Sequence, residues 1–149
     1  MMTTTNENGF TLIEALIAMV ILALGIFALY SMQMASIQGN GRAARVTSAA
    51  TWGADRLETL MTLDYDDPSD PNHELTDKNS DGVAGLDNTD TPGSPADHGP
   101  ETEGPFTIYW NVADDYPAFG TKTVRVLVQR SDQGVVKTVT QEFIMQEPI

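Results

Sequence analysis

A long apolar stretch near the N-terminus dominates the pattern of hydrophobic and polar positions. Residues 15–35 read ALIAMVILALGIFALYSMQMA, and Tyr30 is their only ionisable side chain. A helix rises about 1.5 Å per residue, so roughly 20 apolar residues cross the hydrocarbon core of a bilayer. The pattern predicts that residues 10–35 form an apolar, membrane-spanning half of a helix.

The helical pattern continues beyond the apolar stretch. We expect residues 36–63 to form an amphipathic half of the same helix, loosened or kinked at Gly39-Asn40-Gly41. Arg45 and Ala49, or Asp55 and Arg56, are expected at its surface. Its apolar stripe recurs at steps of three and four residues and comprises Val46, Ala50, Gly53, Leu57, Leu60 and Met61.

Residues 105–149 change to the alternation that is typical of strands. Three segments alternate, PFTIYWNV, TKTVRVLVQ and VVKTVTQEFIM, and SDQG at residues 131–134 is a turn signal. About three antiparallel strands of this size need a helix to cover one face, which predicts an α+β fold. The expected inward residues are Phe106, Ile108, Trp110, Val112, Val124, Val126 and Val128, with Val135, Val139 and Phe143, or Val136 and Ile144, in the last strand.

An acidic loop, residues 64–104, separates the expected helix from the expected sheet. It holds most of the prolines and the densest acidic residues, and such a segment buries too little apolar surface to fold alone. The whole chain has a net charge of −13, which argues against nucleic acid as a partner because phosphate binding requires clustered Lys and Arg. The chain has no cysteine, so it forms no disulfide.

Within this loop, DKNSDGVAGLDN at residues 77–88 matches the first half of an EF-hand-like calcium loop. Gly82 would form the sharp turn, and Asn88 stands where a complete loop has a bidentate glutamate. The alternative interpretation is a solvated turn rich in Asp, Asn and Gly. The predicted calcium ligands are the side chains of Asp77, Asn79, Asp81 and Asp87 and the carbonyl group of Val83.

Other chemistry is not indicated. His73 and His98 lack metal-ligand spacing and are expected at the surface, whereas Trp52 and Trp110 are expected in a core or interface. The chain has no nucleophile elbow and no glycine-rich phosphate loop. We expect no catalytic activity.

Glu14 is the feature that a simple membrane anchor does not explain. A carboxylate at the edge of an apolar span is costly and is usually functional. A secretory signal peptide has a basic N-terminal region and a shorter apolar core, but residues 1–9, MMTTTNENG, contain no Lys or Arg. The remaining interpretation is cleavage before the apolar stretch, which is then retained.

GFTLIE at Gly9–Glu14 resembles the processing signature of type IV prepilins and of the related pseudopilins of type II secretion. This resemblance implies that prepilin peptidase cuts between Gly9 and Phe10 and that Phe10 is N-methylated. Residues 1–9 are then the leader peptide. Glu14 becomes the fifth mature residue, where the family's glutamate meets the N-terminal amine of a neighbouring subunit during assembly.

The resemblance also implies the location and the partners. Before assembly the protein is a single-pass inner-membrane protein with a periplasmic C-terminal domain, and it meets other major and minor pilins and the assembly platform. Afterwards it lies in the pilus at the cell surface. The leader departs from the family pattern because it lacks a basic residue, and Arg42 and Arg45 weakly oppose this orientation.

Within the family, ILALGIF, SMQMAS and DRLETL are most similar to minor pilins of the PilV kind. Major pilins usually carry a proline further along the helix, and the corresponding ALYSMQ has none. This favours a minor type IV pilin that initiates or decorates the fibre and serves motility or adhesion. The alternatives are a type II secretion pseudopilin and, in another class, a membrane-anchored calcium-binding adhesin.

Overall fold

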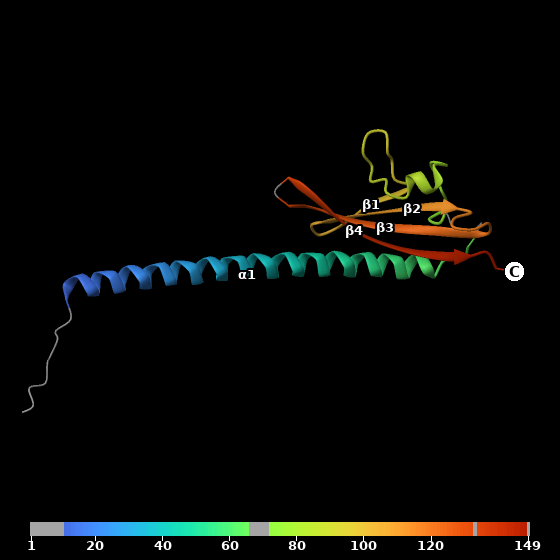
Figure 1. Ribbon diagram of the computed structural model, residues 1–149. Helices are drawn as coiled ribbons and strands as arrows, with labels where there is room; N and C mark the ends of the chain where they lie inside the picture. The colour runs from blue at the N-terminus through green and yellow to red at the C-terminus, as the bar shows by residue number, and fades with distance from the viewer. Residues whose placement is uncertain (1–10, 66–71, 133, 149) are drawn as a thin grey trace, which may run out of the picture. The chain divides into compact units, whose positions relative to one another are not determined.

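The computed structural model describes residues 11–65, 72–132 and 134–148 (Figure 1). Its elements are α1 (Leu12–Met61), the 3-10 helix η1 (Gly82–Gly85), β1 (His98–Glu103), β2 (Phe106–Asp114), β3 (Thr121–Asp132) and β4 (Val135–Gln146). The chain divides into two compact units, Met1–Ala43 and Ala44–Ile149. We describe each unit by itself.

Helix α1 is 50 residues long and covers nearly the whole predicted range. It runs through Gly39-Asn40-Gly41 without a break, so the expected loosening there is wrong. One glycine costs a helix interior about 1 kcal/mol, and the good helix formers Arg42, Ala43 and Ala44 follow directly.

The apolar half of α1 buries nothing within its own chain. In the described part of the first unit, residues 11–43, every large apolar side chain is exposed. By length and composition, this part of α1 is able to cross a membrane. So large an exposed apolar surface requires cover from outside the chain, by lipid or by other protein chains.

The sheet of the second unit has four antiparallel strands in the order β1-β2-β3-β4. The predicted α+β fold, a long helix packed on an antiparallel sheet, is therefore confirmed, with one strand more than the three expected. The extra strand is β1, HGPETE, which lies inside the predicted acidic loop and has no apolar alternation. It pairs with β2, with an irregular register between His98 and Glu101.

The core lies between the sheet and the second half of α1. All inward residues predicted in β2 and β3 are buried. In β4, Val139 and Phe143 are half-buried, whereas Val135, Val136 and Ile144 are exposed. The core cluster comprises Ala49, Leu60, Leu75, Phe106, Ile108, Trp110, Val112, Val124, Val126 and Val128.

The predicted helix stripe is partly wrong. Val46 and Met61 are 55% and 56% exposed, whereas Ala49, expected at the surface, is 5% exposed. The buried residues Ala49, Gly53 and Leu60 lie four and seven positions apart, on one helix face. Small residues on that face let the sheet approach the helix closely. A pattern based on hydrophobicity alone favours valine and methionine over such small residues, and it therefore selected Val46 and Met61.

The part of the acidic loop that holds η1 folds against the sheet face that α1 does not cover, as Figure 1 shows, whereas Leu75 of the same loop joins the core on the α1 side. Leu86 next to η1 is 1% exposed. The buried amide of Asn111 in β2 donates to the carbonyl oxygens of Leu86 and Asn88, at 3.1 and 2.9 Å. The sheet is thus covered on both faces, and the loop gains from the sheet the burial that it could not provide alone.

Candidate functional site

The predicted cleavage site lies outside the described residues, since Gly9 and Phe10 precede the first described position. The description begins with Thr11, whose carbonyl oxygen accepts from the amides of Glu14 and Ala15 at 3.1 and 3.2 Å. Its hydroxyl oxygen accepts from the Glu14 amide at 3.4 Å. Thr11 therefore caps the N-terminal end of α1.

Glu14 lies in the first turn of α1 and is exposed. A carboxylate at a helix N-terminus is favoured by the helix dipole. The flanking Ile13 and Ile17 are 63% and 54% exposed, so the acid stands on an apolar surface. If lipid or apolar helices cover that surface, the charge requires a cationic partner.

Three carboxylates meet where the acidic loop reaches the sheet. Ligand atoms of Asp77, Asp81 and Asp97 all lie within 4.8 Å of one another. Asp77 shapes the loop, since its Oδ1 accepts from the Asp81 amide at 3.2 Å and its Oδ2 from the Gly82 amide at 2.8 Å. Asp81 Oδ2 accepts from Asn88 Nδ2 at 2.8 Å, whereas Asp81 Oδ1 is buried without a hydrogen-bond partner.

Asp97 links this cluster to the sheet. Its side chain is 5% exposed, Oδ2 accepts from the Val112 amide at 2.9 Å, and Oδ1 accepts from the Asn79 amide at 3.1 Å. Burial raises the pKa of the Asp97 carboxyl; the two amides oppose this shift, while the charges of Asp77 and Asp81 add to it. The buried carboxylate therefore lacks sufficient positive charge around it.

This acidic triad could hold a metal ion. Oxygen ligands suit hard cations such as Ca²⁺, and the unpartnered Asp81 Oδ1 is a buried acceptor that a cation would satisfy. The three carboxylates therefore fit the calcium ion that the sequence motif implies.

The structure brings together only part of the predicted ligand set. Asp77 and Asp81 are in the triad, but the Asn79 amide group donates to the Pro95 carbonyl at 2.9 Å. The Val83 carbonyl accepts from the Leu86 amide, and Asp87 pairs with Arg125 at 2.9 Å. Sequence reasoning missed Asp97, because it stands outside the linear motif and only folding places it beside Asp81.

The surface assignment of His98 is wrong. His98 is 4% exposed and stacks on Trp110, with ring centroids 5.2 Å apart, while His73 is exposed as predicted. The Arg56 guanidinium lies 4.0 Å from the Trp110 ring centroid and pairs with Glu74 and Glu101. This stack explains the burial of Trp110. Trp52, at 37% exposed, is not part of the chain's own core.

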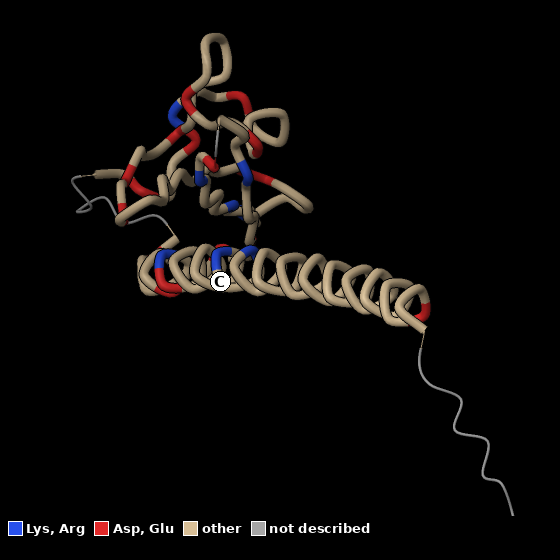
Figure 2. The backbone as a smooth tube through the Cα atoms, turned by 90° about the vertical axis from the view of Figure 1, so that its left-hand side faces the viewer, with Lys and Arg blue, Asp and Glu red and all other residues tan. Residues whose placement is uncertain are grey.

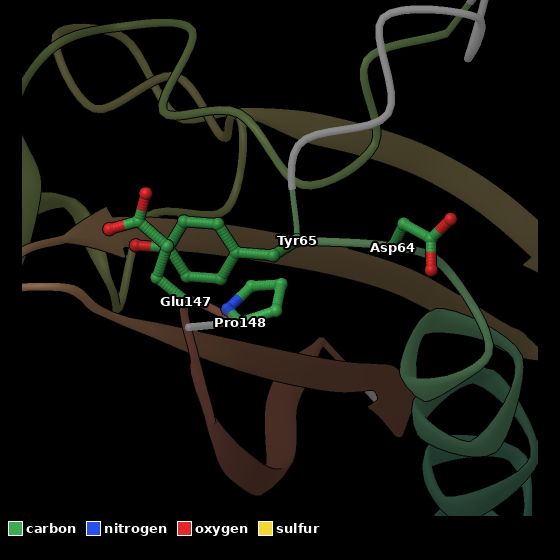
Figure 3. A pocket seen from close by; sticks show the side chains of 4 residues that line it. All are labelled: Asp64, Tyr65, Glu147 and Pro148. Carbon is green, nitrogen blue, oxygen red and sulfur yellow. The ribbon is translucent and has the colours of Figure 1, made fainter.

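Asp64, Tyr65, Glu147 and Pro148 line an open surface pocket (Figure 3). Burial raises the pKa of the Tyr65 hydroxyl, and Lys122 Nζ, which lies 4.5 Å from the ring centroid, opposes that shift. The Asp64 carboxylate points away from Tyr65 in Figure 3.

Comparison with known proteins identifies a sequence motif near the N-terminus. Residues 4–30 match the family model of the prokaryotic N-terminal methylation motif, which includes Gly9, Phe10 and Glu14. No curated protein and no solved structure matches the chain significantly. Proteins with this motif and a pilin-like fold are structural subunits rather than enzymes. The methylation motif, the long half-apolar helix and the antiparallel sheet together make this chain similar to type IV pilins and pseudopilins, whose N-terminal processing motif it carries.

Proposed function

We propose that this chain is a minor type IV pilin that is incorporated into the pilus fibre or initiates it. The observation that carries the proposal is the position of Glu14. It lies within the methylation motif and in the first turn of a helix whose apolar half is wholly exposed. An anchor for one chain needs the apolar helix alone, whereas assembly also needs a charged group that sets the register between helices.

In the proposed mechanism, prepilin peptidase cuts between Gly9 and Phe10. Hydrolysis of this peptide bond leaves a protonated amine on Phe10, which is then methylated. The Glu14 carboxylate of one subunit pairs with the Phe10 amine of a neighbour, and each charge removes the cost of burying the other. The exposed apolar surface of residues 12–37 then packs against other pilin helices.

Two features support a minor rather than a major subunit. The segments ILALGIF, SMQMAS and DRLETL resemble minor pilins of the PilV kind, and ALYSMQ has no proline. The uninterrupted course of α1 through this region agrees with a subunit that lacks the proline of major pilins. A role in fibre assembly, and through the fibre in motility or adhesion, follows from this resemblance.

The test combines mass spectrometry of sheared fibres with Glu14→Ala in the full-length gene. The native protein should occur in fibres as a chain that begins with methylated Phe10. Glu14→Ala should still be cleaved but should be lost from the fibre fraction at least about tenfold, because a buried amine without its partner costs more than 1.4 kcal/mol. A native chain that retains Met1 or Met2, or a Glu14→Ala chain incorporated normally, would contradict the proposal.

We further propose that the acidic triad binds Ca²⁺. Asp77, Asp81 and Asp97 would supply carboxylate oxygens, and the ion would join the acidic loop to β2 through Asp97. The bound ion supplies positive charge to three carboxylates and to the unpartnered Asp81 Oδ1. It would thereby stabilise the loop on the exterior face of the domain, away from α1.

A further inference from the structure

Two asparagines lie next to the acidic triad, and neither belongs to the proposed ligand set. Asn88 lies in the acidic loop and is half-buried, whereas Asn111 lies within β2 and is 1% exposed. A buried amide side chain is costly unless its donors and its acceptor are hydrogen-bonded. The hydrogen-bond partners of the two side chains therefore indicate what each asparagine does.

The two asparagines form a continuous hydrogen-bonded bridge between two members of the triad. Asn88 Nδ2 donates to Asp81 Oδ2 at 2.8 Å. Asn111 Nδ2 donates to the carbonyl oxygen of Asn88 at 2.9 Å, and Asn111 Oδ1 accepts from the Asp97 amide at 2.8 Å. The bridge thus runs from the Asp81 side chain through both asparagines to the main chain of Asp97.

Each amide group of the bridge has one orientation that satisfies its surroundings. If the Asn88 group were turned over, its oxygen would face the Asp81 carboxylate, and two acceptors would repel each other. If the Asn111 group were turned over, its oxygen would face two main-chain carbonyl oxygens and its nitrogen would face the Asp97 amide. The bridge therefore has a single arrangement of donors and acceptors.

Asn88 is the twelfth residue of the calcium motif, where a complete loop has a bidentate glutamate ligand. Its amide nitrogen has no free lone pair for a cation, and it occupies Asp81 Oδ2. Asp81 Oδ1 is buried and has no hydrogen-bond partner, so it is the oxygen that a cation would meet. The carboxylate that the motif lacks at its twelfth position comes from Asp97 in the triad.

The bridge opposes the mutual repulsion of the three carboxylates, whose ligand atoms lie within 4.8 Å of one another. Acidic residues (red in Figure 2) are also spread over the loops of the second unit. Asp97 is fixed to β2 by the Val112 amide, which donates to its Oδ2 at 2.9 Å. The bridge ties Asp81 to the same strand, so the protein holds the two carboxylates together before a cation binds.

We propose that Asn88, held in place by Asn111, is a positioning residue for a cation at the acidic triad. Its hydrogen bond aims Asp81 Oδ1 at the ion, and the bridge fixes the separation of Asp81 from Asp97. This role rests on the proposed calcium site and adds to it two residues that contact ligands instead of the ion. Because the triad cannot contract freely, it also favours Ca²⁺ over the smaller Mg²⁺, which demands near-ideal octahedral geometry.

Isothermal titration calorimetry of the full chain in detergent, with Ca²⁺ and separately with Mg²⁺, tests this role. Asn88→Ala should weaken Ca²⁺ binding by about 10- to 100-fold, the usual effect of removing a partner that orients a metal ligand. The same variant should lower the ratio of Ca²⁺ affinity to Mg²⁺ affinity, which a general loss of stability would not change. The far-ultraviolet circular dichroism of the Ca²⁺-free variant should match that of the native chain.

Asn79→Ala is the matched control in the same motif. The Asn79 amide group donates to the Pro95 carbonyl oxygen, and the main-chain amide that donates to Asp97 is retained in the variant. Its affinity for Ca²⁺ should therefore stay close to the native value. Asn88→Asp separates a positioning residue from a ligand, since an aspartate adds a carboxylate but cannot donate to Asp81. Its affinity should fall, as in Asn88→Ala.

A native chain that does not bind Ca²⁺ would overturn both the calcium proposal and the role of Asn88. Native binding with an unchanged affinity in Asn88→Ala would overturn the role of Asn88 alone. Tighter binding by Asn88→Asp than by the native chain would show that the twelfth position ligates the ion. A larger loss in Asn79→Ala than in Asn88→Ala would restore the ligand set of the linear motif, and either result would contradict the positioning role.

Discussion

At the residue scale, Gly53 decides how closely the helix approaches the sheet. A Cβ atom at this position would lie 2.9 Å from Gln141 Oε1 and 3.2 Å from Val128 Cγ2. Val128 is 1% exposed and has no room to withdraw. The absence of a side chain is therefore what allows α1 to lie directly on β3 and β4.

Gly53→Leu should consequently lower the free energy of unfolding by about 1–3 kcal/mol, the usual cost of overpacking a core. Thermal or denaturant unfolding of the full chain in detergent measures this change. Gly39→Leu is the matched control on the same helix, since nothing lies within 4 Å of its added Cβ. Equal stability of the two variants would show that the close approach at Gly53 is not required.

Arg56 joins three parts of the second unit at one point. It stacks on Trp110 at 4.0 Å and pairs with Glu74 at 3.2 Å and with Glu101 at 3.0 Å. Its side chain is only 14% exposed, so the expected surface position of Arg56 is wrong and these contacts are little screened by water. The guanidinium thus connects α1 to β2, β1 and the acidic loop.

Arg56→Ala should lower the free energy of unfolding by about 2–4 kcal/mol, because it leaves a partly buried carboxylate pair without its cation. Arg56→Lys should recover only part of this loss, since an ammonium group neither stacks on Trp110 nor pairs with two carboxylates in one plane. Urea unfolding monitored by tryptophan fluorescence measures both variants. Full recovery by lysine would argue that charge alone matters at this position.

At the element scale, the acidic loop depends on the sheet and, by our proposal, on Ca²⁺. Millimolar Ca²⁺ should raise the melting temperature of the full chain, because an ion that binds only the folded state stabilises it. Asp81→Asn should abolish most of the rise, whereas Glu103→Gln, an exposed acid in β1, should leave it intact. An unchanged melting temperature in the native chain, measured by scanning calorimetry, would remove the calcium proposal.

Because the pKa of Asp97 is raised, the stabilisation by calcium should depend on pH. Above the ordinary aspartate pKa of 3.8 and up to its raised value, the folded chain retains a proton that the unfolded chain has lost. In this window the contribution of Asp97 to stability falls as pH rises. Since Ca²⁺ binds the ionised carboxyl, the calcium-dependent rise in melting temperature should be larger at pH 7 than near pH 4.

The elements differ in how well their sequences predict them. β2 and β3 follow the alternation of FTIYWNV and VRVLV, and the face that packs on α1 was predicted residue by residue, whereas the burial of Asn111 and Leu127 on the opposite face was not. β1 was not predicted because HGPETE has no apolar alternation. Its pairing with β2 and the stack of His98 on Trp110 hold it in place. Pairing with a neighbour is a tertiary property, and local sequence contains no signal for it.

At the scale of the whole molecule, our proposal has the chain change its surroundings once. Its exposed apolar half-helix suits a bilayer first and a bundle of helices later, and the proposed cut after Gly9 would create the charge that pairs with Glu14. By this proposal, removal of the leader controls whether the assembly charge exists.

Gly9→Leu should block processing, because a bulky residue hinders the extended backbone that the peptidase must reach. The full-length chain should then accumulate in the membrane and be absent from fibres, as judged by intact-mass analysis of both fractions. Gly9→Ala should have a mild or moderate effect and serves as the size control. Normal cleavage of Gly9→Leu would contradict the assigned cleavage site.

The sequence by itself determined the features that depend on residues close together along the chain: the apolar half-helix, the processing motif with Glu14, and the alternating strands. These depend on short spacings along the chain, and periodicity reports them directly. Only the tertiary structure decided that Asp97 joins Asp77 and Asp81, that His98 is buried, and that Ala49 replaces Val46 in the core. Each of these joins residues far apart in sequence or depends on how closely two elements pack, and neither leaves a pattern in the order of amino acids.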